Sequence, residues 1–181
     1  MTNLPWFKTQ IQGDRKLVFD PLRKIYCALT PEEEVRQKAL FLLVEHLGVP
    51  AGLLAVEYAI KVNGLDKRCD AVVFANDGAP LMILECKAAS VALSQATLDQ
   101  ALRYYSALRP LYLMLYNGIQ CYCFQAENGT LQAMDHIPSY SEMTAKKDRR
   151  PSGRRSTIMK IKKTTVSFLI GKALSTFGMS A

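Results

Sequence analysis

Two apolar runs on either side of a short polar turn constrain the fold of this chain most strongly. Residues 69–75 and 81–87 are rich in Val, Ile, Leu and Ala, and both read as strands. Asp77-Gly78 between them favours a two-residue type I′ hairpin turn. The turn predicts the pairs Phe74–Leu81, Val72–Ile83 and Asp70–Glu85. Small or apolar side chains occupy the opposite face at Cys69, Ala71, Val73, Ala75, Met82, Leu84 and Cys86. Both faces of this hairpin are therefore predicted to be buried.

Charged side chains interrupt these strands at one end of one face. Asp70 is expected opposite Glu85, and Lys87 points to the same face because side chains alternate along a strand. Directly opposed residues have Cβ atoms about 4.5–5.5 Å apart, close enough for two carboxylates to share one cation. Since buried like charges are costly without a cation, we predict Mg²⁺ or Mn²⁺ held by Asp70, Glu85 and the backbone carbonyl of Cys86. Lys87 would then orient or help deprotonate a water. The alternative is a structural salt bridge of Lys87 with either acid.

The remaining periodicity predicts helix, three strands, helix, two strands. Thr30-Pro31-Glu32-Glu33 has an N-cap threonine, a proline in the first turn and a glutamate that can reach back to the cap, so a helix should begin there and end near Gly48. Strands are expected over 54–62, 69–75 and 81–87, a helix over 94–108, and strands over 111–116 and 120–125. Val18-Phe19 and Ile25-Tyr26 could add an edge strand. The fold class is mixed α/β, one sheet flanked by helices.

Charge divides the chain into a neutral body and a basic tail. Residues 1–140 hold 13 basic and 14 acidic side chains, whereas residues 141–181 hold 10 basic and 2 acidic ones, which accounts for the net charge of +7. Pro, Ser and Gly accompany the basic residues, a composition typical of linkers. We therefore expect one domain over 1–140 and a basic linker and tail over 141–181.

Composition also bounds the location of the protein. An odd count of 5 cysteines and the absence of an apolar leader are unlike a secreted, disulfide-bonded protein. No run of 18 or more apolar residues is present, so no membrane span is expected. A cytoplasmic location is predicted.

Several longer motifs resemble a known family. Arg68-Cys69-Asp70 followed by Glu85-Cys86-Lys87 is similar to the PD-(D/E)xK nucleases. The stretches Phe19-Asp20-Pro21-Leu22-Arg23-Lys24, Thr30-Pro31-Glu32-Glu33 with Val35-Arg36-Gln37, Val62-Asn63-Gly64 and Glu85-Cys86-Lys87-Ala88 resemble the N-terminal nuclease region of type I restriction R proteins, also found as small stand-alone proteins. The resemblance covers residues 19–138. It departs from the family pattern at Cys69, where the motif name has proline, and at Ala89.

The resemblance implies a fold, an activity and partners. The fold would be restriction-endonuclease-like, with an αβββαβ core, and the activity a Mg²⁺-dependent endonuclease hydrolysing DNA in a restriction or mobile-DNA defence system. Gln100 and Tyr104 match a Q-x-x-x-Y element of this group, and their spacing of four places both on one helix face. They would support the catalytic arrangement of Asp70, Glu85 and Lys87, or form a polar ridge. Restriction-system subunits or a second copy of the chain are the expected protein partners.

Basic residues supply the candidates for nucleic-acid contact. Arg68 flanks Asp70, and Lys146, Lys147, Arg149 and Arg150 begin the tail. They would attract phosphate without reading sequence. Three interpretations stay open: a nuclease, a non-catalytic nucleic-acid-binding or assembly module of the same fold, and a membrane-surface protein that uses the tail. Additional roles for Glu33 and Glu57 also stay open.

Overall fold

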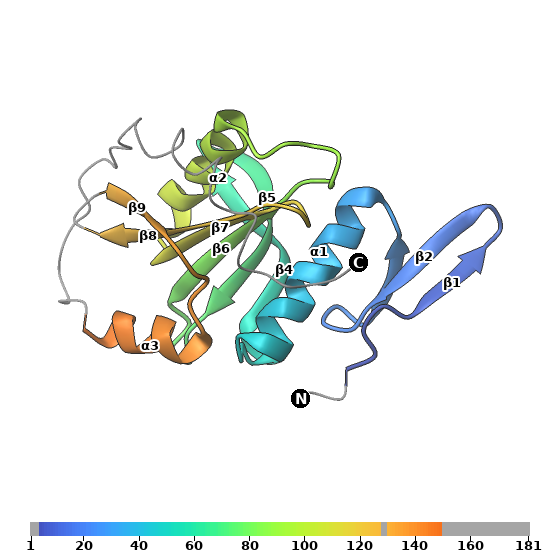
Figure 1. Ribbon diagram of the computed structural model, residues 1–181, viewed down its shortest axis with the longest axis horizontal. Coiled ribbons are helices and arrows are strands. Elements are labelled where there is room, and N and C mark those ends of the chain that lie inside the picture. The colour runs from blue at the N-terminus through green and yellow to red at the C-terminus, as the bar shows by residue number, and fades with distance from the viewer. Residues whose placement is uncertain (1–3, 128–129, 150–181) are drawn as a thin grey trace.

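The computed structural model describes residues 4–127 and 130–149, which form two β-sheets and three α-helices (Figure 1). Within these residues the larger sheet has the strand order β4-β5-β6-β7-β8-β9, with β6 and β7 parallel and the other neighbours antiparallel. Its strands are β4 Leu54–Val62, β5 Leu65–Phe74, β6 Pro80–Cys86, β7 Tyr112–Tyr116, β8 Cys121–Glu127 and β9 Thr130–Met134. The predicted mixed α/β class and the αβββαβ order of the core are confirmed.

The first helix, α1 (Pro31–Phe41), begins where the sequence predicts it. Thr30 Oγ1 accepts a hydrogen bond from the Glu33 N–H at 3.0 Å, and proline stands in the first turn, where its missing N–H costs nothing. The helix continues as a π-helical turn, Leu42–His46, and ends before Gly48, whose φ of +71° is the left-handed conformation that glycine adopts at helix ends.

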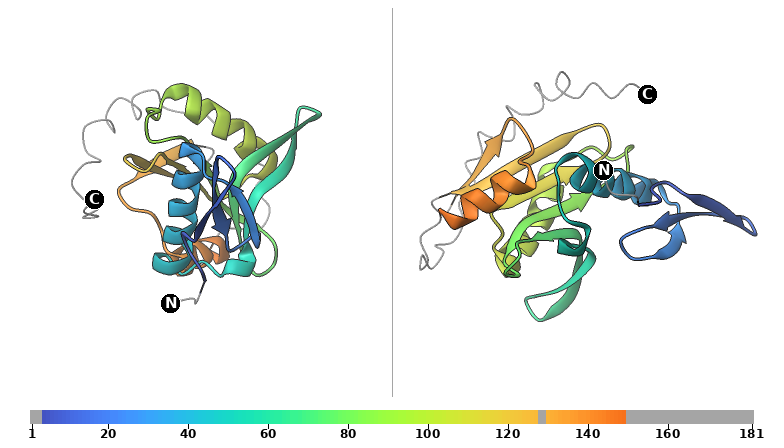
Figure 2. Two further views of the ribbon diagram at one scale, coloured as in Figure 1. Left: turned by 90° about the vertical axis from the view of Figure 1, so that its right-hand side faces the viewer. Right: turned by 90° about the horizontal axis from the view of Figure 1, so that it is seen from below.

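Helices cover both faces of the larger sheet (Figures 1 and 2). α1 and α3 (Tyr140–Asp148) pack on one face, and α2 (Gln95–Leu108) packs on the other. α2 also forms the crossover that a parallel strand pair requires between β6 and β7. Because these two strands are covered on both sides, 81–84 and 113–115 are apolar at every position and buried.

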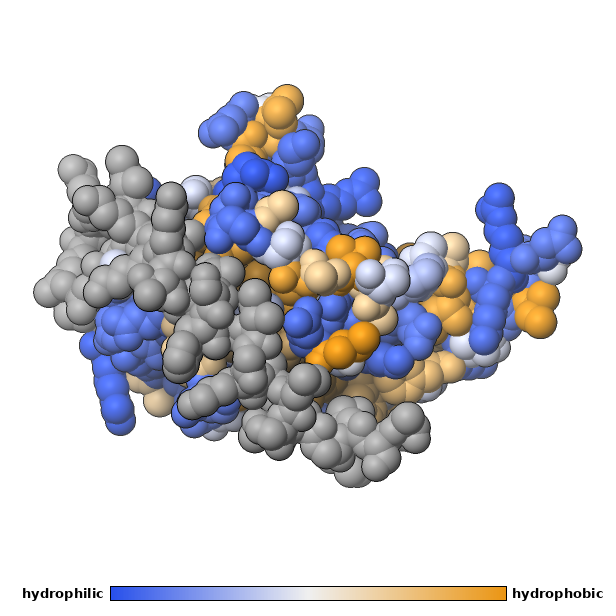
Figure 3. Space-filling model, turned by 45° about the horizontal axis from the view of Figure 1, so that its top comes forward, coloured by the Kyte–Doolittle hydropathy of each residue, from blue (hydrophilic) through white to orange (hydrophobic). Residues whose placement is uncertain are grey.

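A three-stranded antiparallel sheet forms an arm beside α1 (Figures 1 and 2). It consists of β1 Thr9–Gln12, β2 Arg15–Asp20 and β3 Ile25–Ala28. The residues expected to add an edge strand lie in β2 and β3. These strands pair with each other and not with the larger sheet, so that expectation is wrong. Asp20 fixes their tight connection by accepting the N–H groups of Leu22 and Arg23, both at 2.9 Å. Hydrophilic residues dominate the outer end of the arm in Figure 3.

The hairpin that joins β5 to β6 has the expected register but a different turn. Val72 pairs with Ile83 as predicted. The Gly78 N–H donates to the Ala75 carbonyl at 2.9 Å, and Gly78 has a φ of +80°. These features define a three-residue loop with a bulge, so the turn is not the predicted type I′. Phe74 consequently pairs with Pro80 and not with Leu81, and a bulge beside Val73 restores the predicted register further along.

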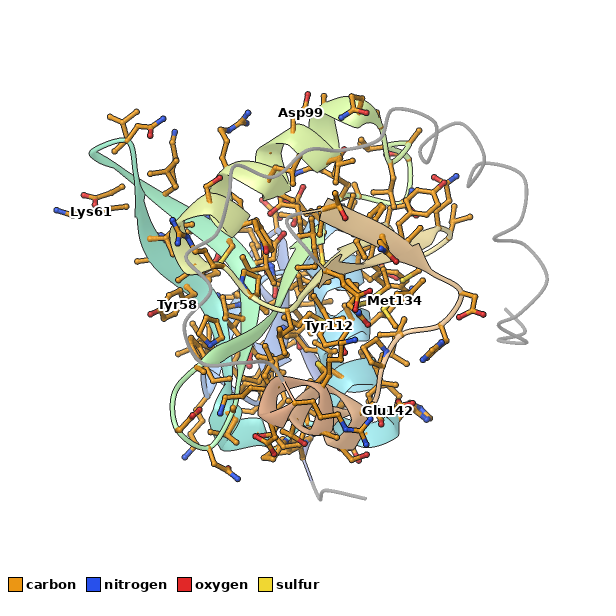
Figure 4. The ribbon with its side chains drawn as sticks, turned by 90° about the vertical axis from the view of Figure 1, so that its left-hand side faces the viewer. Tyr58, Lys61, Asp99, Tyr112, Met134 and Glu142 are labelled. Atoms are coloured by element: carbon orange, nitrogen blue, oxygen red, sulfur yellow. The ribbon has the colours of Figure 1, made fainter. Side chains whose placement is uncertain are left out.

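A kink in β4 changes which face the neighbouring residues occupy. Glu57 has a left-handed φ of +50° in the middle of the strand. Beyond it, Cys69 packs in the cluster under α2, whereas Ala71 packs in the cluster under α1. The prediction that Cys69 shares a face with Ala71 is therefore wrong. The β4–β5 hairpin turns past the sheet edge, and Figure 4 shows Lys61 near its tip, pointing away from the body.

The segment after residue 140 is more ordered than its composition predicted. α3 is capped by Ser139, whose Oγ accepts the Glu142 N–H at 3.3 Å, and Met143 is fully buried. Helix α3 therefore extends the described structure to Asp148, past the boundary expected at 140, and residues 150–181 lie outside the described part. In the part that the structure describes, each helix is too short or too polar to cross a membrane.

Candidate functional site

One pocket gathers four of the five predicted catalytic residues where β5 and β6 stop pairing. The last ladder pair is Ala71 with Leu84, so the strands separate at the next position on each. The pocket has a volume of about 200 Å³ and lies between α1, the strands β4–β6 and α2. Its lining residues are Glu32, Arg36, Glu57, Arg68, Cys69, Asp70, Glu85, Lys87 and Gln100.

Asp70 is fixed by partners on both sides. Its Oδ1 accepts from Arg36 Nε at 3.0 Å and lies 2.9 Å from Arg36 Nη2, and its Oδ2 accepts from the Cys86 N–H at 2.6 Å. The predicted ladder pair of Asp70 with Glu85 does not form, because the Asp70 side chain replaces the backbone partner of Cys86. An ionised carboxylate has about four acceptor positions, and three are taken here.

Glu85 is the most buried charged side chain of the pocket. Burial raises its pKa to about 7, and the nearby charge of Asp70 adds to this, while Lys87 opposes it. Lys87 Nζ at 2.9 Å and Gln100 Nε2 at 2.5 Å both donate to Oε1, so neither occupies Oε2. Glu85 is therefore near the midpoint of its ionisation at neutral pH, and a cation in the pocket would favour the charged form.

Lys87 and Gln100 both contact Glu85, whereas Tyr104 lies behind Gln100. Burial opposes the charge on Lys87, but the hydrogen bond and charge of Glu85 outweigh it and raise the pKa of the ammonium. Lys87 is thus a cation at neutral pH. Tyr104 Oη lies 3.2 Å from Gln100 Nε2, and Tyr104 is only 6% exposed and does not line the pocket. The Q-x-x-x-Y pair consequently meets the site through Gln100, with Tyr104 behind it.

A buried ion-pair network behind the pocket was largely missed by the sequence reasoning. Glu33 accepts from Arg23 at 3.2 Å, from Gln37 at 2.9 Å and from Arg36. Its carboxylate therefore does not accept a hydrogen bond from the Thr30 N–H, and the expected capping box does not form. Glu57 accepts from Arg23 at 2.7 Å and from Arg36 at 3.4 Å. The signal available was the i, i+3 and i, i+4 spacing from Glu33 to Arg36 and Gln37, which shares one helix face.

When Glu85 is ionised, the pocket and the network behind it hold two more negative than positive groups. The carboxylates are Asp20, Glu32, Glu33, Glu57, Asp70 and Glu85, and the cations are Arg23, Arg36, Arg68 and Lys87. Because buried charge is costly unless it is compensated, a divalent cation is the group that this imbalance suits.

The available donors fit Mg²⁺ or Mn²⁺. Such ions bind through one or two carboxylates and keep several waters. Asp70 and Glu85 supply the carboxylates, and the carbonyl of Cys86 lies on the Asp70 side of β6, because the N–H and C=O of a strand residue point the same way. Across residues 4–127 and 130–149, no three His, Cys, Asp or Glu side chains converge on one metal position. Water and the carbonyl would therefore complete the ligand set.

The predicted nucleic-acid-binding residues separate into two groups. Arg68 lines the pocket, with a side chain 70% exposed and Nη1 3.9 Å from Glu57. Lys146 pairs with Glu127 at 3.3 Å, and Lys147 pairs with Asp77 in the β5–β6 turn. That turn is about 17 Å along β6 from Glu85, at about 3.3 Å per residue. Arg149 follows α3 directly, and Arg150 lies outside the described residues.

Comparison with known proteins identifies the family. Residues 31–138, more than half of the chain, match the model of the type I restriction enzyme R protein N terminus (HSDR_N). The chain belongs to this family. The matched segment of this R-protein N-terminal domain includes every residue that lines the pocket, whereas Asp20 and Arg23 of the supporting network precede it.

Two further comparisons were made, with solved structures and with curated proteins. A solved structure described as a fragment of an HsdR subunit of a type I restriction enzyme from Vibrio vulnificus YJ016 is similar, with a TM-score of 0.48 and 19% sequence identity. The similarity covers 64% of this chain and 24% of that one. A search of curated proteins gives no match.

Proposed function

We propose that this R-protein N-terminal domain is a Mg²⁺-dependent deoxyribonuclease that hydrolyses phosphodiester bonds at the pocket between β5, β6 and α2. The observation that carries the proposal is the meeting of Asp70, Glu85 and Lys87 in one pocket whose surroundings hold an excess of negative charge. Membership in the R-protein family supports DNA as the substrate, and a multi-subunit restriction system in the cytoplasm as its setting.

Each residue has a chemical part in this proposal. Asp70, Glu85 and the Cys86 carbonyl would hold the metal ion, which when bound would lower the pKa of water and polarise a phosphate oxygen. Lys87 stays an ammonium, so it orients the attacking water and stabilises negative charge on the phosphate rather than accepting a proton. Gln100 holds Glu85 through a hydrogen bond of 2.5 Å, and Tyr104 positions Gln100.

Plasmid nicking tests the proposal with matched controls from the β4–β5 hairpin. We expect supercoiled DNA to be nicked with Mg²⁺ or Mn²⁺, and D70N and K87M to lose at least 100-fold of the rate, on the order of the effect of removing one catalytic group. D66N and K61M remove the same groups from a surface pair outside the pocket and should retain the parent rate. Equal nicking by all five proteins would indicate contamination and refute the proposal.

One observation favours a second function, a non-catalytic DNA-binding or assembly module. Arg36 already compensates Asp70, so the pocket is partly neutralised without metal. This alternative predicts DNA binding that is indifferent to Mg²⁺, weakens steeply with salt and falls when Lys146, Lys147, Arg149 and Arg150 are changed together to Gln in the full chain. Fluorescence anisotropy with a labelled duplex distinguishes the two functions.

A further inference from the structure

Arg36 stands where a metal ion would compensate the same acids. Its Nε and Nη2 both approach Asp70 Oδ1, Nη1 contacts Glu33 and lies 3.4 Å from Glu57, and Nη2 lies 3.9 Å from Glu32. The whole residue is only 8% exposed. One guanidinium thus contacts four carboxylates at the back of the pocket, two of them deeply buried.

The contacts of Arg36 with Asp70 restrict how a divalent ion can use the same carboxylate. Two Arg36 nitrogens occupy Oδ1, and the Cys86 N–H occupies one position on Oδ2. A divalent ion bound at the remaining position would sit within a few ångströms of the guanidinium. Like charges repel strongly at such distances when water is largely excluded. The charge of Arg36 therefore opposes metal binding at Asp70, although one position on Oδ2 stays free.

We propose that Arg36 is a resident counter-cation that holds Asp70 in place in the metal-free domain and weakens its affinity for the divalent ion, because its positive charge stays close to the position that the metal would take. The inference rests on the proposed function in taking Asp70 as a metal ligand. Arg36 is accordingly a positioning residue.

Arg23 provides a matched control within the same network. Its guanidinium contacts Asp20 at 2.7 Å, Glu33 at 3.2 Å and Glu57 at 2.7 Å, and its side chain is 17% exposed. It shares two acids with Arg36, but its contacts do not include Asp70. Replacing Arg23 therefore disturbs the network without releasing the proposed ligand.

The test is a Mn²⁺ titration of the full chain, followed by the electron paramagnetic resonance signal of free Mn²⁺, for the parent, R36Q and R23Q. We expect R36Q to bind Mn²⁺ at least about tenfold more tightly than the parent, since a repelling charge is removed, and R23Q to change the affinity by less than about threefold. Thermal unfolding should show a lower Tm for R36Q in EDTA and a larger gain from Mn²⁺ than for the parent.

The outcomes separate this inference from the proposed function. Equal or weaker binding by folded R36Q, with the parent still binding through Asp70 as shown by loss in D70N, overturns the role of Arg36 and leaves the metal site intact. No Mn²⁺ binding by the parent or R36Q overturns both. If R36Q does not fold even with Mn²⁺, R36M decides, because methionine removes the charge and leaves no unpaired polar group in its place. Tighter binding by R36M supports the inference, and unchanged binding overturns it.

Discussion

Replacing Glu85 with its amide should stabilise the metal-free domain above neutral pH. In the folded protein burial and Asp70 raise the pKa of Glu85 from 4.5 to about 7. This pKa of about 7 already includes the lowering effect of the Lys87 ammonium. A rise of this size makes ionisation of Glu85 about 3 kcal/mol less favourable in the folded state than in the unfolded chain. The E85Q variant avoids this cost while keeping the shape of the side chain.

The sign of the pH dependence follows from proton linkage. Below pH 4.5 Glu85 is protonated in both states and costs nothing. As the pH rises from 4.5 to about 7, the unfolded chain loses this proton first, so the stability of the parent falls relative to E85Q. Above pH 7 the difference is constant. The free energy of unfolding of E85Q minus that of the parent should therefore increase by about 3 kcal/mol between pH 4.5 and pH 8.

Urea unfolding in EDTA at pH 4.5, 6 and 8 and constant ionic strength measures this difference. E127Q is the control, because Glu127 is a partly exposed acid on the same sheet as Glu85 and pairs with Lys146 of α3. The free energy of unfolding of E127Q should stay within about 0.5 kcal/mol of the parent value at each pH. A flat profile for E85Q, or a loss of stability at pH 8 compared with pH 4.5, would refute the reasoning. Saturating Mg²⁺ should raise the stability of the parent at pH 8 more than that of E85Q, because the ion favours the charged carboxylate.

Three further predictions concern stability and are measured by urea unfolding. D70N should cost about 3–5 kcal/mol in EDTA, because it removes one of the two deeply buried acids that pair with the guanidinium of Arg36; a cost below 1 kcal/mol would contradict that pairing. M143A should cost about 2–5 kcal/mol, since Met143 is 0% exposed, whereas no change would mean that α3 behaves as a linker. G118A and G64A both place alanine at a positive φ, +86° and +78°, but only at Gly118 would the new methyl meet a side chain, of α1, at 3.4 Å. Because 3.4 Å is an ordinary van der Waals separation, the positive φ decides both variants, and each should lose about 1 kcal/mol; a much larger loss in G118A would contradict this.

Local sequence signals predicted most of the fold because they act over short distances. Thr30 and Pro31 define the start of α1 through their own backbone neighbours. The apolar runs of β6 and β7 follow from burial on both faces. The Asp77-Gly78 turn gave the correct register for Val72 with Ile83, although the turn type was wrong, because the bulge compensates for the longer loop.

The failures occur where tertiary contacts override a local rule. Regular alternation placed Cys69 on the face of Ala71, but the left-handed conformation of Glu57 on the neighbouring strand turns the hairpin over. Nothing in the composition around Glu57 marks that conformation, which is rare for a residue with a side chain. The contacts that accompany it are two arginines from other elements, Arg23 and Arg36. Strained backbone of this kind persists only where the surrounding structure holds it.

The same reasoning explains why the proximity of Asp70, Glu85 and Lys87 was predicted and the contact of Arg36 with Asp70 was not. Asp70, Glu85 and Lys87 lie on two strands whose register follows from one turn, so their proximity could be worked out from spacing. Arg36 reaches Asp70 across 34 residues, and that contact depends on how α1 packs against the sheet. An isolated helix would leave Arg36 in water beside Glu33, a surface pair worth less than about 1 kcal/mol. Packing the helix against β5 removes this water and pairs Arg36 with Asp70. Arg36 is then the counter-charge that decides how strongly Asp70 can bind a metal ion.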